Sequence, residues 1–153
     1  MLALPKVGRR YIIDTDACAY QVGCVLLQEQ DGDERPKPIG YWSRSLSKSE
    51  QNYTTTEQEC LAVVWAVLIL RPYLEGTEFT IRTDHDSLKL LLNLSDATGR
   101  LQRWRLRLQQ FEYVINHCPG VQHRAADAVS RLATTGLDQT EIDDDLSVLM
   151  ADQ

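Results

Sequence analysis

Two aspartates lie two positions apart in the segment YIIDTDACAY, residues 11–20. The apolar run Tyr11–Ile13 predicts a strand that enters a hydrophobic core. Side chains two apart on a strand point to the same face, so Asp14 and Asp16 are expected to share one face. Because a buried carboxylate without a partner is costly, that face must meet either water or a positive charge.

Three further carboxylates stand out, and each also has an ordinary structural interpretation. Glu59 is the last position of a Thr-x-x-Glu capping box that begins at Thr56. Asp84 follows a predicted strand, where it can cap the next helix, and Asp127 lies between alanines at what can be a surface position of a helix. Glu57 is about 200° round the helix from Glu59, so these two side chains cannot share a target.

The ordinary interpretations weaken when the four acids are taken together. If the first and fourth strands are neighbours, Asp16, Glu59, Asp84 and Asp127 can meet at one place. Crowded carboxylates raise one another's pKa values unless cations neutralise them. Oxygen-only ligand sets suit Mg²⁺ or Mn²⁺, and two such ions about 4 Å apart support in-line phosphoryl displacement.

The elements that must position these acids follow from the periodicity of the chain. Strands are expected at 10–17, 22–29, 39–45, 78–84 and 112–118. Helices are expected at about 57–70, 85–93, 99–111 and 124–132. The helix near 57–70 is apolar all round from Leu61, which predicts burial on most sides. The helix at 99–111 is amphipathic, with an apolar face of Leu101, Trp104, Leu108 and Phe111. This order of elements predicts an α/β fold with a mixed sheet.

Length and composition indicate one globular domain with a hydrophobic core. The chain has 153 residues, of which 43% are apolar and 25% charged. The net charge of −6 resides in residues 138–153, which hold six acids and no Lys or Arg, so residues 1–137 carry no net charge. The charge therefore does not argue against a nucleic-acid partner for the domain.

The sequence shows no membrane or export signal. The longest uncharged apolar run, Cys60–Leu70, has 11 residues, whereas a membrane-spanning helix needs about 20. The N-terminus lacks a basic region followed by an apolar stretch, so no secretory signal is expected. The four cysteines have no zinc-site spacing and are expected to be free thiols. An intracellular location, cytoplasmic or nuclear, is expected.

Four blocks of sequence together carry a family resemblance. They are TDAC followed by GCVLLQ, YTTTEQECLAVVWAV, LRPYLEGTEFTIRTDHDSLKLL and HCPGVQHRAADAVSRL. In order and spacing they resemble the ribonuclease H domain of Pol polyproteins from gypsy-type LTR retrotransposons, over about residues 5–133. The resemblance implies a ribonuclease H-like, five-stranded mixed sheet in the order 3-2-1-4-5, with helices on both faces.

The resemblance also implies the roles of the acids. Asp16, Glu59, Asp84 and Asp127 match the catalytic acids that hold two Mg²⁺ ions, with Mn²⁺ as a substitute. Asp16 and Asp127 would hold the ion that activates water, and Asp16, Glu59 and Asp84 the ion at the leaving group. Glu59 rather than Glu57 matches, because it directly precedes the CLAVV run.

Several neighbouring residues receive weaker assignments from the resemblance. His117, ten residues before Asp127, has the spacing of a mobile histidine that helps proton transfer or product release in related enzymes. His123 lies where relatives often have Asn or His, and either histidine can equally be an ordinary loop residue. Asp14 does not match a catalytic acid and is interpreted as a neighbour on the same face. Cys18 replaces the usual serine and touches no expected metal ligand.

An arginine row is the candidate for contact with nucleic acid. Arg100, Arg103 and Arg107 are spaced to share one face of the helix at 99–111, with Arg105 elsewhere and Trp104 toward the core. A solvated face is the ordinary interpretation, but such a row can follow phosphates. Relatives act on RNA·DNA hybrids, which are sensed through A-like shape and 2′-hydroxyls.

The resemblance therefore implies an endonuclease that hydrolyses the RNA strand of RNA·DNA hybrids during reverse transcription and leaves 5′-phosphate products. Residues 1–9 are interpreted as a remnant of the linker from a reverse transcriptase domain, 10–134 as the ribonuclease H domain, and 135–153 as a flexible acidic tail. The alternative is a catalytically silent, retroelement-derived binding or structural domain. A metal-dependent nuclease or resolvase acting on DNA is a second alternative.

Overall fold

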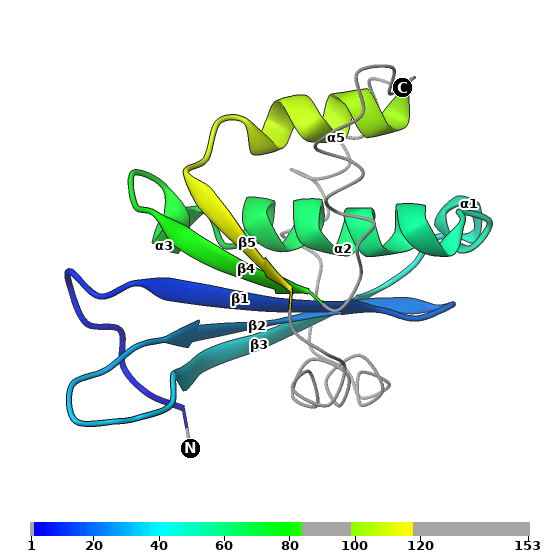
Figure 1. The fold of residues 1–153 in the computed structure, drawn as a ribbon. Helices are drawn as coiled ribbons and strands as arrows, with labels where there is room; N and C mark the ends of the chain where they lie inside the picture. The colour runs from blue at the N-terminus through cyan, green and yellow to red at the C-terminus, as the bar shows by residue number, and fades with distance from the viewer. Residues whose placement is uncertain (1, 84–98, 118–153) are drawn as a thin grey trace.

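Five strands form one mixed sheet in the order β3-β2-β1-β4-β5 (Figure 1). The computed structural model describes residues 2–83 and 99–117. The strands are β1 Tyr11–Ala17, β2 Gln21–Gln28, β3 Lys37–Ser45, β4 Phe79–Thr83 and β5 Tyr113–His117. β1, β2 and β3 are antiparallel neighbours, whereas β1–β4 and β4–β5 are parallel. The predicted sheet and its strand order are confirmed.

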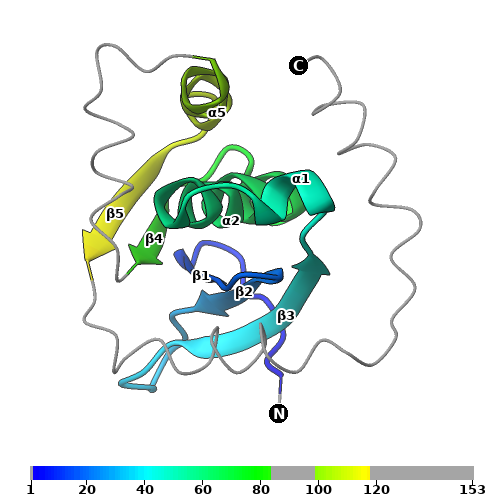
Figure 2. The ribbon, with the colours of Figure 1, turned by 90° about the vertical axis from the view of Figure 1, so that its right-hand side faces the viewer.

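The helices of the described part of the chain stack above one face of the sheet. They are α1 Lys48–Gln51, α2 Thr55–Ile69, α3 Arg71–Leu74 and α5 Arg100–Leu108. α2 lies across the sheet and α5 lies on the far side of α2 from it (Figure 2). The helices predicted at 85–93 and 124–132 lie outside the described residues. No helix within 2–83 and 99–117 is long and apolar enough to cross a membrane.

Helix α2 begins two residues earlier than predicted, because another threonine caps it. The hydroxyl of Thr54 accepts a hydrogen bond from the Glu57 amide at 3.2 Å. The helix ends at Ile69, and Pro72 lies in the first turn of α3, where the missing proline amide costs no helical hydrogen bond. The short helix α1 was not predicted, although Ser47 and Glu50 form a complete capping box.

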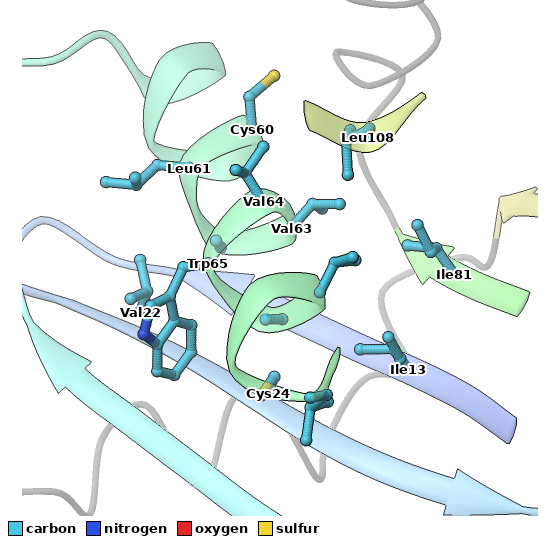
Figure 3. Close-up of a cluster of buried hydrophobic side chains, with 14 of the residues drawn as sticks. Ile13, Val22, Cys24, Cys60, Leu61, Val63, Val64, Trp65, Ile81 and Leu108 are labelled. Atoms are coloured by element: carbon cyan, nitrogen blue, oxygen red, sulfur yellow. The ribbon is translucent and has the colours of Figure 1, made fainter. Parts of the chain in front are cut away.

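The main core fills the space between the sheet, α2 and α5. Every residue of α2 from Gln58 to Val67 is buried. Figure 3 shows α2 side chains among residues from four other elements, including Ile13 of β1, Ile81 of β4 and Leu108 of α5. The predicted apolar face of α5 is confirmed, with Trp104 and Leu108 buried in this core.

The opposite face of the sheet carries a separate buried cluster of Ile12, Val25 and Leu27. Ile13 belongs to the core beneath α2, so the alternation of β1 assigns Ile12 and the two aspartates that follow it to the opposite face. The predicted common face of Asp14 and Asp16 is therefore the face that α2 does not cover.

The segment before β1 is attached to β2 through one buried amide. Gln28 is 0% exposed, and its side chain bonds the backbone of Lys6 in both directions at 2.7 Å and the Arg9 carbonyl at 3.2 Å. The Ala3 amide also donates to the carbonyl of Pro38 at 2.8 Å. Residues that were interpreted as linker thus lie against the sheet.

Gly40 in β3 provides a test of the packing around the sheet. A Cβ at this position would lie 2.8 Å from Cζ3 of Trp42, whose ring also packs edge-on against Tyr73. The Gly40→Ala variant is expected to lose about 1–3 kcal/mol of unfolding free energy, because the indole must move. Urea unfolding followed by circular dichroism measures the loss.

The same substitution in a Trp42→Ala background is the control. Without the indole, Gly40→Ala is expected to cost much less, so the double-mutant cycle should show strong coupling. An equal cost in both backgrounds would contradict the packing role given to Trp42.

Candidate active site

Asp14 meets a positive charge, which answers the question raised by its position in an apolar run. Its carboxylate is 1% exposed and accepts hydrogen bonds from Nε and Nη2 of Arg82 at 2.6 and 2.5 Å. The two residues are register partners in the parallel strands β1 and β4. Asp14 is therefore one half of a two-pronged ion pair whose partner, Arg82, could not be identified from the sequence pattern alone.

Asp16 lies near the end of β1 and remains partly exposed. Its register partner in β2 is Gly23, which has no side chain to crowd the carboxylate. Within the described residues, the register of β1 with β4 runs to Asp14 and Arg82, two residues earlier. Asp16 thus lies two residues beyond the Asp14–Arg82 register pair.

Glu59 is 5% exposed and lies in the second turn of α2. Because Thr54 is the N-cap, Glu59 is five positions into the helix and cannot be the capping-box partner of Thr56. Figure 1 shows the N-terminal end of α2 above the end of the sheet at which β1 finishes, and α2 packs on β1. The arrangement brings Glu59 to the end of the sheet that carries Asp16.

The cysteine beside Glu59 does not supply a thiolate. Burial, with the negative charges of Glu59 and Glu57, raises the pKa of Cys60 to about 12. Burial also raises the pKa of Cys24 in β2 far above its ordinary value. Among the described candidate ligands the donors are carboxylate oxygens, a set that suits Mg²⁺ or Mn²⁺ better than Zn²⁺.

The described residues contain only part of the predicted site. Asp84, Asp127 and His123 lie outside them, and no group of three potential metal ligands gathers within 2–83 and 99–117. His117 is the last residue of β5 and pairs in register with Thr83 of β4, the residue before Asp84. Strand β5, whose last residue is His117, therefore ends at the same end of the sheet as β4.

The arginines of α5 differ in their surroundings. Nη1 of Arg100 lies 2.9 Å from Oε2 of Glu57, and its guanidinium lies 3.9 Å from the ring centroid of Tyr53. Arg103 is exposed, and Arg107 is partly buried. Arg100 thus fastens α5 to the start of α2, a tertiary role that the helical spacing alone did not reveal. Nucleic-acid contact by the row remains a prediction.

Comparison with known proteins identifies the family. A five-stranded mixed sheet in the order β3-β2-β1-β4-β5 is the arrangement of a ribonuclease H-like fold. The family described as "RNase H-like domain found in reverse transcriptase" matches residues 6–111. The chain belongs to this family.

Relatives of the chain come from retrotransposons. It is 39% identical over 132 residues to the retrovirus-related Pol polyprotein from transposon 297 of Drosophila melanogaster, covering 86% of this chain and 12% of the relative. It is 38% identical over 138 residues to the transposon Tf2-3 polyprotein of Schizosaccharomyces pombe, covering 88% and 10%. The chain spans about a tenth of the length of these relatives.

Solved structures share the fold. LC11-RNase H1, isolated from compost, superposes with a TM-score of 0.61 at 16% identity and covers 81% of this chain and 94% of that one. The foamy viral protease-reverse transcriptase in complex with an RNA/DNA hybrid gives 0.59 at 15% identity, covering 90% and 18%. At these identities the likeness concerns the fold.

The Arg100 contacts generate a stability prediction. Arg100→Ala removes an ion pair and a cation–π contact, so the unfolding free energy is expected to fall by about 1–2 kcal/mol. The matched change on the exposed side of the same helix, Arg103→Ala, is expected to stay within about 0.5 kcal/mol of the wild type. Unfolding of both variants in guanidinium measures the two free energies. Equal losses of unfolding free energy in the two variants would contradict the role of Arg100 in attaching α5 to α2.

Proposed function

We propose that this chain is a metal-dependent endonuclease that hydrolyses the RNA strand of RNA·DNA hybrids. The observation that carries the proposal is the position of two of the expected acids: Asp16 lies near the end of β1, and Glu59 lies in the second turn of α2, the helix that packs on β1. Family membership supports it, because an RNase H-like domain places its chemistry on carboxylates of these elements. Asp84, the expected third acid, follows Thr83, the last residue of β4, directly in the chain.

Four acids are proposed to hold two Mg²⁺ ions, with Mn²⁺ as a substitute: Asp16, Glu59, Asp84 and Asp127. When bound, the ions supply activation of a water molecule and stabilisation of the leaving oxygen. In the reaction, water attacks the scissile phosphorus and the bond to the 3′-oxygen breaks. The products are a 5′-phosphate and a 3′-hydroxyl that takes up a proton. His117 ends β5 beside Thr83 and is the proposed group for proton transfer or product release.

The hybrid is the proposed substrate because of the proteins in which domains of this family occur. Its relatives are Pol polyproteins of retrotransposons, and the family occurs in reverse transcriptases. The foamy viral enzyme with this fold is bound to an RNA/DNA hybrid. In its parent polyprotein the domain is proposed to remove RNA behind a reverse transcriptase domain. The exposed Arg103 of α5 is a candidate phosphate contact.

Cleavage of an end-labelled RNA·DNA hybrid tests the proposal. The wild type is expected to cut only the RNA strand, only in the hybrid, and only with Mg²⁺ or Mn²⁺ present. Glu59→Gln and Asp16→Asn are expected to lower the rate by about 10²-fold or more, since each removes a charged ligand. Asp84→Asn tests the third acid in the same way.

Glu57→Gln is the matched control, because it makes the same change two residues away on α2. Glu57 bonds Arg100 rather than facing the site, so its variant is expected to cut within a few-fold of the wild type. Equal loss in both glutamine variants would contradict the assignment of Glu59. Hybrid binding without cleavage would favour the silent binding domain, and cleavage of a DNA duplex would favour a general nuclease.

A further inference from the structure

The Asp14–Arg82 ion pair connects β1 and β4 two residues before Asp16. Its two hydrogen bonds, of 2.6 and 2.5 Å, join neighbouring parallel strands at a pair of register partners. Asp14 is 1% exposed and the Arg82 side chain 21% exposed. A planar guanidinium held at two points fixes orientation as well as distance, which a single hydrogen bond does not.

Both expected metal-binding strand positions come directly after this pair. Asp16 follows Asp14 by two residues on the same face of β1, and Asp84 follows Arg82 by two residues in the chain. Beyond the pair, β1 retains its register with β2 through Gly23 and Val22. The ion pair therefore fixes β1 against β4 two residues before Asp16.

The ion pair also determines which aspartate of β1 remains available as a metal ligand. Side chains two apart on a strand begin about 7 Å from each other, so Asp14 lies within reach of an ion held by Asp16. Both oxygens of Asp14 accept hydrogen bonds from Arg82. A carboxylate engaged in this way is a poor additional ligand, and a guanidinium engaged in this way is kept from approaching the cation.

We propose that Asp14 and Arg82 form a positioning pair, which holds the strand ends at the spacing that two Mg²⁺ ions require and keeps Asp14 out of the ligand set. This inference rests on the proposed metal-dependent function. The pair is proposed to act through the expected ligands two positions further along the chain, Asp16 after Asp14 and Asp84 after Arg82.

A second two-point arginine–carboxylate pair, between strand β3 and helix α1, lies elsewhere in the fold. Arg44 of β3 donates to both oxygens of Glu50 of α1 at 2.7 and 3.0 Å, and both side chains are mostly buried. Although burial raises the pKa of Glu50, the bonds from Arg44 and the Ser47 amide outweigh it and lower the pKa. β3 is an edge strand, separated from β4 by two other strands, so this pair is the matched control.

The experiment compares Asp14→Asn, Arg82→Lys and Glu50→Gln with the wild-type chain. Electron paramagnetic resonance of Mn²⁺ measures metal binding without any hybrid present. The Mg²⁺ concentration for half-maximal hybrid cleavage is the second readout, and thermal unfolding is the third. Arg82→Lys keeps the charge but loses the two-point geometry, so it supplies a folded test if Asp14→Asn does not fold.

Asp14→Asn and Arg82→Lys are each expected to weaken Mn²⁺ binding and raise the Mg²⁺ requirement by about 10-fold or more, the usual range for residues that orient ligands. Glu50→Gln is expected to lower the unfolding midpoint yet leave both metal readouts within about two-fold. Metal binding that is unchanged in Arg82→Lys, or weakened equally in Glu50→Gln, would overturn the inference.

The readouts separate this inference from the proposed function. A wild-type chain that binds Mn²⁺ but does not cut the hybrid would overturn the proposed activity, while the binding data would still decide the role of the pair. A wild-type chain that binds no Mn²⁺ would overturn both.

Discussion

The burial of α2 on every side is the constraint on which the rest of the structure depends. A helix that is apolar all round needs a partner on each flank, and here the sheet lies below it and α5 above it. Only near its ends can such a helix present polar groups without cost. Its start is where Thr54, Glu57 and Glu59 lie, which ties the position of the candidate acid to the packing of the whole domain.

The apolar core and the polar contacts stabilise the sheet in different ways. The burial of apolar side chains is non-directional and tolerates small shifts. It therefore packs the helices and strands together without fixing the register of the strands by itself. The Arg82–Asp14 pair and the Gln28 amide are directional, and each fixes one segment against β1 or β2. Directional contacts of this kind lie at both ends of the sheet, one beside the candidate site and one beside the N-terminal segment.

Much of the fold could be predicted from the sequence, because alternation and apolar periodicity are local signals. The strand order came from the family resemblance, since local patterns do not specify which strands are neighbours. The start of α2 was misplaced because three consecutive threonines, Thr54–Thr56, offer equivalent caps. α1 was missed because its single turn is polar and has no apolar face.

The candidate site was only partly predictable for a related reason. The carboxylates are visible as residue types, and the structure carries Asp16 and Glu59 to one end of the sheet. The partner of Asp14 depends on the register between strands 68 residues apart, and the contact of Arg100 with Glu57 depends on how α5 packs on α2. Neither is a property of a short window of sequence. Asp84, Asp127 and His123 lie outside the described residues.

The separation of Asp14 from Arg82 has a consequence for how the chain folds as it leaves the ribosome. The three-strand meander is complete by Ser45, yet Asp14 has no counter-charge until β4 emerges. Before β4 has been synthesised, burying the charged Asp14 side chain without a partner is costly. The central strand β1 is therefore expected to stay solvated until Arg82 is available. The sheet can close only when distant segments arrive together, which favours late, concerted assembly over a misfolded hairpin core.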